Sequence, residues 1–140
     1  MGVSWVFEHD KSAKEVERLL EGGGAEQIGT FTVDCLPYIP NDKLTGVEYR
    51  LRDFVIRVGT ASQVTTAKGV IVEAIIFVEY EPSQLAVQSV HMMTEMMQMF
   101  FPQYADNKPD VINKTSPEPY SALDTMYQYL MIFRRMRKKA

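Results

Sequence analysis

Two stretches rich in β-branched and aromatic residues stand in the middle of the chain, between residues 48 and 80. The first reads EYRLRDFVIRVGT and the second KGVIVEAIIFVEY, and a polar loop over residues 61–68 joins them. Parallel strands need a crossover of about a dozen residues or more, whereas antiparallel strands are joined by a short turn. The spacing therefore predicts an antiparallel hairpin over residues 48–80.

The alternation of side chains predicts which faces of the hairpin are apolar. The first strand, residues 49–58, places three apolar side chains on each face: Phe54, Ile56 and Val58 on one, and Tyr49, Leu51 and Val55 on the other. In the second strand, residues 69–80, one row is wholly apolar, and the other row interrupts its apolar residues with Glu73 and Glu79. One apolar and one mixed face are typical of a sheet that is covered on one side only.

The segment before the hairpin, residues 1–42, predicts a strand, a helix and a strand. Residues 3–7 alternate and contain the only Trp. Ser12 and Glu15 have the spacing of a capping box, and the three glycines at 22–24 predict the end of the helix that follows. Residues 28–36 read as the second strand, and residues 43–47 as a short connector to the hairpin.

Two helices are predicted after the hairpin, over about residues 84–101 and 122–138, and we expect both to cover one face of the sheet. Ser121 and Asp124 repeat the capping pattern at the start of the second helix. In the first, Met92, Met96 and Met99 widen the apolar stripe beyond the usual core-facing side. Because Met repacks easily, this helix either lies in the core or offers an adaptable surface to a partner.

Composition indicates a single soluble domain of the α+β class over residues 1–140, with an antiparallel sheet and flanking helices. The longest apolar run, residues 74–78, is far below the ~18 residues of a membrane-spanning helix, so no membrane contact is expected. The beginning of the chain lacks the pattern of a secretory signal. Cys35 is the only cysteine, which fits a reducing, intracellular compartment, and its apolar neighbours predict a buried structural thiol.

The net charge is −3, but basic residues are concentrated at the end of the chain, at positions 134, 135, 137, 138 and 139. Such a tail is compatible with contact to nucleic acid. It is equally the composition of a solvated helix C-terminus, where cations complement the helix dipole. The acidic body argues against a broad nucleic-acid-binding face, so no direct nucleic-acid partner is predicted.

Candidate chemistry is sparse. No metal-ligand cluster, nucleophile elbow or dinucleotide fingerprint is present, so no catalytic, cofactor-binding or metal residue is predicted and no cofactor is expected. The nearest approach to a site combines three carboxylates with three arginines on the neighbouring strand: Glu73, Glu79 and Glu81 with Arg50, Arg52 and Arg57. This set resembles the metal-dependent, tunnel-type triphosphatases. However, the Lys that follows their Glu-x-Glu is missing here, which favours ordinary surface charges.

Several segments occur in the order seen in one known family. They are MGV at the start, GAEQ at 24–27, GTFTVDC at 29–35, YRLRDFVIRVGT at 49–60, KGVIVE at 68–73, VEY at 78–80 and DTMYQY at 124–129. With these segments the chain resembles subunit 20 of the Mediator complex, the coactivator that links transcription factors to RNA polymerase II. None of the segments is a catalytic signature.

The resemblance implies a partial β-barrel with flanking helices and a nuclear, non-enzymatic subunit of the Mediator head module that regulates transcription through protein–protein contacts. The partners it implies are Mediator subunit 18, as a heterodimer, the C-terminal helix of subunit 8, other head-module subunits and, indirectly, RNA polymerase II. The family's middle section, expected between residues 35–42 and 43–49, is largely missing, and residues 74–77 look like an insertion. The sequence therefore leaves open whether the sheet closes into a barrel or stays open with exposed edges.

Overall fold

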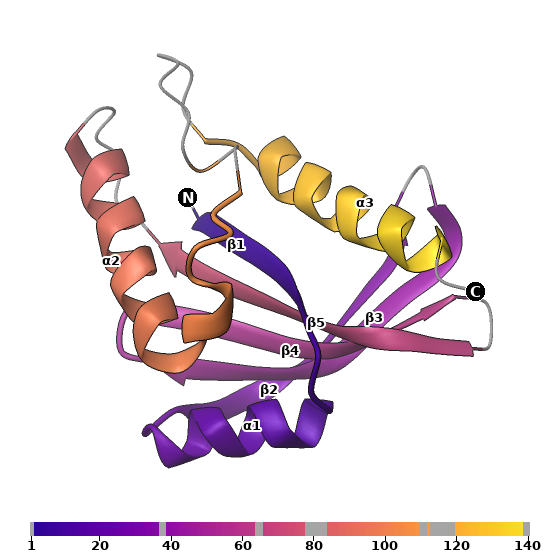
Figure 1. The fold of residues 1–140 in the computed structure, drawn as a ribbon, viewed down its shortest axis with the longest axis horizontal. Helices are drawn as coiled ribbons and strands as arrows, with labels where there is room; N and C mark the ends of the chain where they lie inside the picture. Colours follow the sequence, from indigo (N-terminus) through magenta and orange to yellow (C-terminus); the bar gives the residue numbers. More distant parts are fainter. Residues whose placement is uncertain are drawn as a thin grey trace.

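A computed structural model describes residues 2–36, 39–63, 66–77, 84–109, 112 and 120–138. These described residues form five strands, three α-helices and one short 3-10 helix: β1 (Gly2–His9), α1 (Ala13–Gly22), β2 (Glu26–Leu36), β3 (Ile39–Leu51), β4 (Phe54–Gln63), β5 (Thr66–Phe77), α2 (Gln84–Phe100), η1 (Pro102–Tyr104) and α3 (Ala122–Lys138). Figure 1 shows their arrangement.

The strands form one antiparallel sheet in the order β1-β5-β4-β3-β2. The first strand therefore lies beside the last, with Gly2 opposite Phe77 and His9 opposite Val70. Within the described ranges β1 and β2 are the two edges and do not pair with each other, so the sheet is open. This confirms the expected α+β fold with an antiparallel sheet, and the strand order answers the question of closure that the sequence left open.

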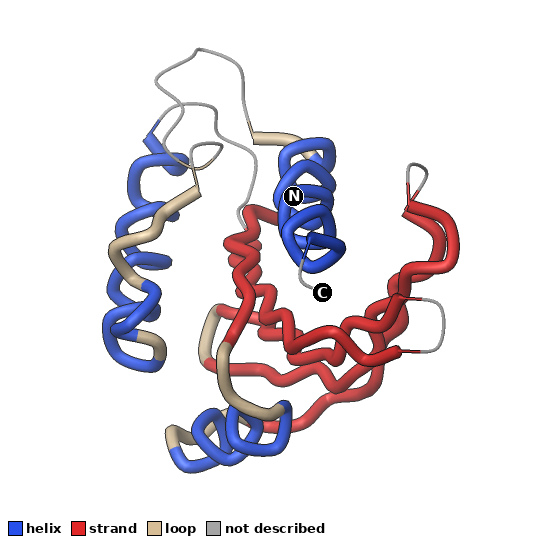
Figure 2. The backbone as a smooth tube through the Cα atoms, turned by 45° about the vertical axis from the view of Figure 1, so that its right-hand side comes forward, coloured by secondary structure: helices blue, strands red, loops and turns tan. Residues whose placement is uncertain are grey.

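The sheet curves, and helices lie on both of its sides (Figure 2). α1 and α2 pack against the side that carries Trp5, Ile56 and Val72, while α3 lies in the hollow of the opposite side against Val6 and Ile71. The prediction that both helices after the sheet cover one face is therefore wrong. In the mixed row of β5, Ile71, Glu73 and Ile75 are buried, and other side chains bind the Glu73 carboxylate there, whereas Phe77 is exposed.

The central hairpin differs from the prediction at its first strand. Residues 49–58 are not one strand, because the chain reverses at Arg52 and Asp53, between the end of β3 and the start of β4. Arg52 has a φ of +56°, the left-handed conformation used in tight hairpin turns. The alternation of apolar and polar residues runs through the turn, which hides it in the sequence.

The turn also changes the faces. Tyr49 lies opposite Ile56 and Leu51 lies opposite Phe54, and directly opposed residues in a hairpin point to the same side of the sheet. Tyr49 and Leu51 therefore join Phe54 and its neighbours in one core, and not the opposite face as predicted. Residues 43–47, predicted to be a connector, belong to β3, whereas the antiparallel pairing of β4 with β5 is confirmed.

Two glycines, Gly46 of β3 and Gly59 of β4, lie directly opposite each other in the pairing of these two strands. A Cβ atom on Gly46 would lie 1.9 Å from the backbone oxygen of Val58. Because no real Cβ makes such a contact, the close approach of these strands requires glycine at this position.

The predicted helix starts are confirmed where the structure describes them. The Ser12 hydroxyl accepts a hydrogen bond from the Glu15 N–H at 3.2 Å, which caps α1. The carboxylate of Asp124 accepts one from the Ser121 N–H at 2.8 Å at the start of α3. Both caps follow the spacing read from the sequence.

Candidate functional site

A buried carboxylate lies at the centre of the interface between the sheet and α3. Glu73 on β5 is only 3% exposed. One of its oxygens accepts a hydrogen bond from the Ser4 hydroxyl of β1 at 2.7 Å, and the other accepts one from the hydroxyl of Tyr129 on α3. Nη1 of Arg57 on β4 lies 3.5 Å from that second oxygen. We call these four residues the Glu73 cluster.

The charge of the Glu73 cluster is balanced through a third strand. Arg57 also donates to a carboxylate oxygen of Glu48 on β3 at 2.7 Å. Burial alone lowers the pKa of Arg57, but the hydrogen bond to Glu48 and the charges of Glu73 and Glu48 outweigh burial and raise it. The guanidinium thus stays charged between two carboxylates and ties β3, β4 and β5 together.

Tyr129 is held as a hydrogen-bond donor in this cluster. Burial and then the neighbouring charge of Glu73 raise the pKa of Tyr129 well above its ordinary value. The hydroxyl therefore keeps its proton over the physiological pH range and points it at the carboxylate. A buried ion that is hydrogen-bonded on all sides avoids most of the cost of burying a charge.

The geometry of the Glu73 cluster favours packing over chemistry. Both oxygens of Glu73 are engaged by protein donors, and Glu73 does not line the large cleft beside α3. A general base or metal ligand needs an open position for the atom it acts on. The arrangement instead fastens α3 to three strands of the sheet.

The other residues of the charged set predicted from the sequence are not seen to take part in the Glu73 cluster. Arg50 and Arg52 are exposed, so among the described arginines only Arg57 meets a carboxylate of the set. Glu79 and Glu81 lie outside the described residues. Within the described ranges no three His, Cys, Asp or Glu side chains gather closely enough to hold a metal ion. The side chain of Cys35 also lies outside the described part.

A second polar contact joins α3 to the edge of β1. Gln128 accepts a hydrogen bond from the Val6 N–H at 2.7 Å and donates one to the Ser4 carbonyl at 2.8 Å. Its amide thus occupies backbone groups that a neighbouring strand would otherwise use. The structural roles of Gln128, Ser4 and Tyr129 were not predicted from the sequence. The one signal in the sequence is a glutamine among the apolar positions of a predicted helix.

The structure confirms that the Met-rich helix lies in the core, while its use as a surface for a partner stays a prediction. Met93, Met96 and Met97 are buried in the core, whereas Met92 and Met99 are exposed, Met99 by 64%. The two exposed residues line a shallow hollow of about 210 Å³ together with the β3–β4 turn at Arg52 and Asp53. We call this region the Met surface.

At the basic end of α3, one arginine forms an ion pair with the sheet and two others are exposed. Nη2 of Arg137 lies 3.2 Å from a carboxylate oxygen of Asp42, a buried residue near the start of β3. Arg134 and Arg135 are exposed. The side chains of residues 138–140 lie outside the described part. Among the described helices, none has the length and apolar character needed to cross a membrane.

These features define an α+β protein with an open five-stranded sheet, helices on both sides and a central charge cluster whose contacts hold the layers together. Over residues 42–134 the chain matches the family model described as TATA-binding related factor (TRF) of subunit 20 of Mediator complex. The chain belongs to the Mediator subunit 20 family.

Individual relatives agree with this assignment. The chain is 35% identical to the Caenorhabditis briggsae protein "Mediator of RNA polymerase II transcription subunit 20", over an alignment of 201 residues that takes in 99% of this chain and all of that protein. The subunit 20 proteins of Gallus gallus and Homo sapiens are 34% and 32% identical over 94 residues, which cover 67% of this chain but only 43% and 42% of those proteins.

The alignments also bear on the missing section. The alignment with the nematode protein is longer than this chain of 140 residues, so that protein carries residues without a counterpart here. The family match begins at residue 42, beside the place where the sequence predicts the missing section. The resemblance read from the sequence segments is confirmed.

Proposed function

We propose that this chain is a structural, non-enzymatic subunit of the Mediator head module, acting in the nucleus and supporting RNA polymerase II transcription through protein–protein contacts. Membership of the subunit 20 family is the observation that carries the proposal. The 140 residues act in it as a single domain. The partners proposed are Mediator subunit 18, the C-terminal helix of subunit 8 and, through them, the remaining head-module subunits.

The use of buried charge supports a role without catalysis. Glu73 and Arg57 are the charged residues that most resemble an active site. They bind each other, and their hydrogen bonds are made with Ser4, Tyr129 and Glu48. Substrate chemistry needs a polar group that is reachable and not already satisfied. No observation on the described residues favours a phosphohydrolase.

Two surfaces are suited to assembly. The Met surface exposes flexible thioether side chains that adapt to varied shapes. The edge strand β2 exposes Ile28, Thr30 and Thr32. An edge strand of 11 residues offers a row of backbone groups to a partner strand. Permanent contacts of this kind often bury more than about 2,000 Å².

Mixing with purified Mediator subunit 18 on a size-exclusion column tests the proposal. We expect one co-eluting peak for the native chain. Met99→Glu should weaken or abolish co-elution, because it places a charge in the Met surface. Leu123→Glu is the matched control, since Leu123 is 78% exposed on the opposite side of the sheet, and it should co-elute. A folded native chain that elutes separately from subunit 18 contradicts the proposal.

A further inference from the structure

A cleft of about 930 Å³ runs along the outer edge of β1. α3 forms one wall, the segment from Tyr104 to Pro109 contributes to the other, and β1 and the start of β5 form the floor. Its apolar lining comes from Val6, Val70, Pro109, Met131 and Ile132. The cleft is separate from both the Glu73 cluster and the Met surface.

The backbone at this edge is already engaged by side chains. Gln128 binds the Ser4 carbonyl and the Val6 N–H, and the Tyr104 hydroxyl accepts a hydrogen bond from the Asp10 N–H at 2.9 Å. A guest that added a strand here would have to displace these contacts. The cleft is therefore better suited to a guest that satisfies its own backbone, which means a helix anchored by side chains.

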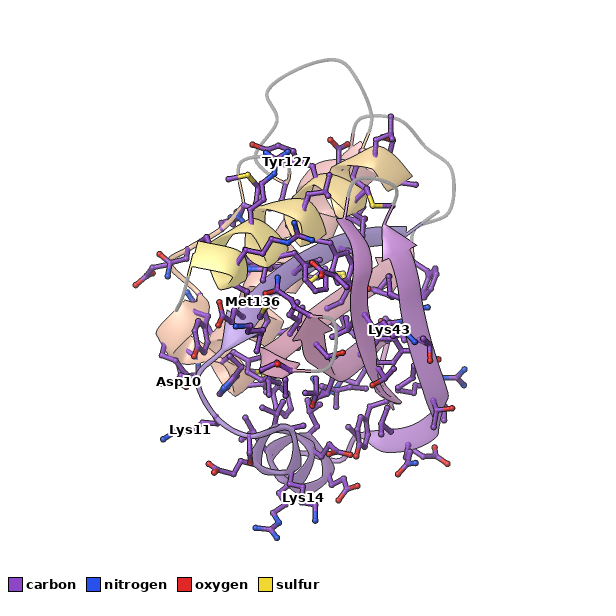
Figure 3. The ribbon with its side chains drawn as sticks, turned by 90° about the vertical axis from the view of Figure 1, so that its right-hand side faces the viewer. Asp10, Lys11, Lys14, Lys43, Tyr127 and Met136 are labelled. Carbon is purple, nitrogen blue, oxygen red and sulfur yellow. The ribbon has the colours of Figure 1, made fainter. Side chains whose placement is uncertain are left out.

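The outer side of α3 presents an apolar line that leads into the cleft. Leu123, Tyr127 and Met131 follow at four-residue spacing, which places them on one side of a helix. They are 78%, 52% and 42% exposed, and the last two line the cleft. Figure 3 shows Tyr127 on the outer side of α3. A line of this kind matches the apolar face of a second helix.

The charges around the cleft determine which charged side chains a bound helix would carry beside its apolar face. Lys11, Lys68 and Arg135 line it, and Arg134 is exposed on the same last turns of α3. Two carboxylates, those of Glu8 and Asp10, lie at the floor. The Asp10 carboxylate accepts a hydrogen bond from the Tyr104 hydroxyl at 2.9 Å, which stabilises its charge within the chain. Acidic side chains on the guest would meet the cations at the rim.

We propose that the cleft between β1 and the α3 line of Leu123, Tyr127 and Met131 binds an acidic amphipathic helix from another protein. The stretch from Leu123 to Arg135 spans about 18 Å, or between three and four turns, which sets the length of the guest. The cleft lies apart from the Met surface and from the edge strand β2, the two surfaces proposed above for assembly.

A nucleic acid is the less favoured guest, although its phosphates would also meet the basic rim. Glu8 and Asp10 lie at the floor, and the walls combine aliphatic side chains with the rings of Tyr104 and Tyr127. Carboxylates at the floor repel phosphates, and the aliphatic part of the walls offers bases no stacking platform. An amphipathic helix uses both the apolar walls and the basic rim.

Fluorescence polarisation on the full chain tests the proposal. The probe is a labelled synthetic peptide of about 15 residues, long enough for four helical turns, with Leu at helical spacing and Glu on the flanks. A peptide with the same Leu residues and Lys in place of Glu is the charge control, and a single-stranded oligonucleotide is the third probe. We expect saturable binding of the acidic peptide that weakens with added salt, and no saturable binding of the Lys peptide.

Variants locate the site. Tyr127→Ser and Arg135→Glu should each raise the dissociation constant of the acidic peptide about tenfold, as expected for central contacts of a helix in a groove. Leu19→Ser, at an exposed leucine on α1, should leave the dissociation constant unchanged, and unchanged thermal melts establish that each variant is folded. Equal binding of the two peptides, tighter binding of the oligonucleotide, or equal affinity of the native chain and the folded Tyr127→Ser variant would each overturn the proposal.

Discussion

The tyrosine of the Glu73 cluster gives the sharpest test of how α3 is held on the sheet. Tyr129 is 4% exposed and donates a hydrogen bond to the carboxylate of Glu73. Tyr129→Phe removes this hydrogen bond and leaves the ring in place. Tyr127→Phe makes the same chemical change two residues earlier, on a side chain that is half exposed.

The expected magnitude follows from the partners that remain. A hydrogen bond to a charged group contributes about 1.5–3 kcal/mol to stability. Glu73 keeps Ser4 and Arg57, so the carboxylate is not left bare, and we expect Tyr129→Phe to cost about 2 kcal/mol. With a urea m-value of about 2 kcal/mol/M, the unfolding midpoint falls by about 1 M.

Urea unfolding followed by circular dichroism measures both midpoints. Tyr127→Phe should stay within about 0.5 kcal/mol of the native chain, as is usual for surface substitutions. A double-mutant cycle with Glu73→Gln should show a coupling of about 1–2 kcal/mol between Tyr129 and Glu73. Equal midpoints for the two Tyr→Phe variants, or no coupling in the cycle, would refute the role given to the cluster.

Two further predictions concern backbone packing and pH. Gly46→Ala should cost about 3 kcal/mol or more, because its Cβ meets the Val58 backbone, whereas Gly29→Ala in β2 meets nothing within 4 Å and should cost less than about 1 kcal/mol by thermal melting. Burial lowers the pKa of His9, so the unfolded chain takes up its proton first, and stability present above pH ~6.5 should fall as the pH drops below that value. His9→Gln should flatten this decline between pH 7 and 5, while the exposed His91→Gln should keep it.

Local patterns in the sequence were sufficient where one segment carries the whole interaction. Ser12 with Glu15 and Ser121 with Asp124 predict helix starts, because each cap involves residues three apart. The range 122–138 of the last helix and the antiparallel sheet follow from spacing in the same way. The family resemblance supplied the assignment, and it left open whether the sheet closes into a barrel.

The errors arise where the deciding contact lies far away in the chain. The turn at Arg52 and Asp53 carries polar residues in step with the strand alternation, so periodicity alone extends one strand through it. Glu73 reads as a solvent-facing residue until Ser4 and Tyr129, 69 and 56 positions away, supply its hydrogen bonds. That burial is what allows α3 to cover the second face of the sheet.

The central claim is that this member of the subunit 20 family works as an assembled, non-catalytic part of Mediator. Affinity purification of the tagged chain from nuclear extract of its own organism, followed by mass spectrometry, tests that claim most directly. We expect Mediator subunits, with subunit 18 foremost, in amounts comparable to the chain itself, and a strong loss of them with Met99→Glu. Recovery of the folded native chain without any Mediator subunit would contradict the account.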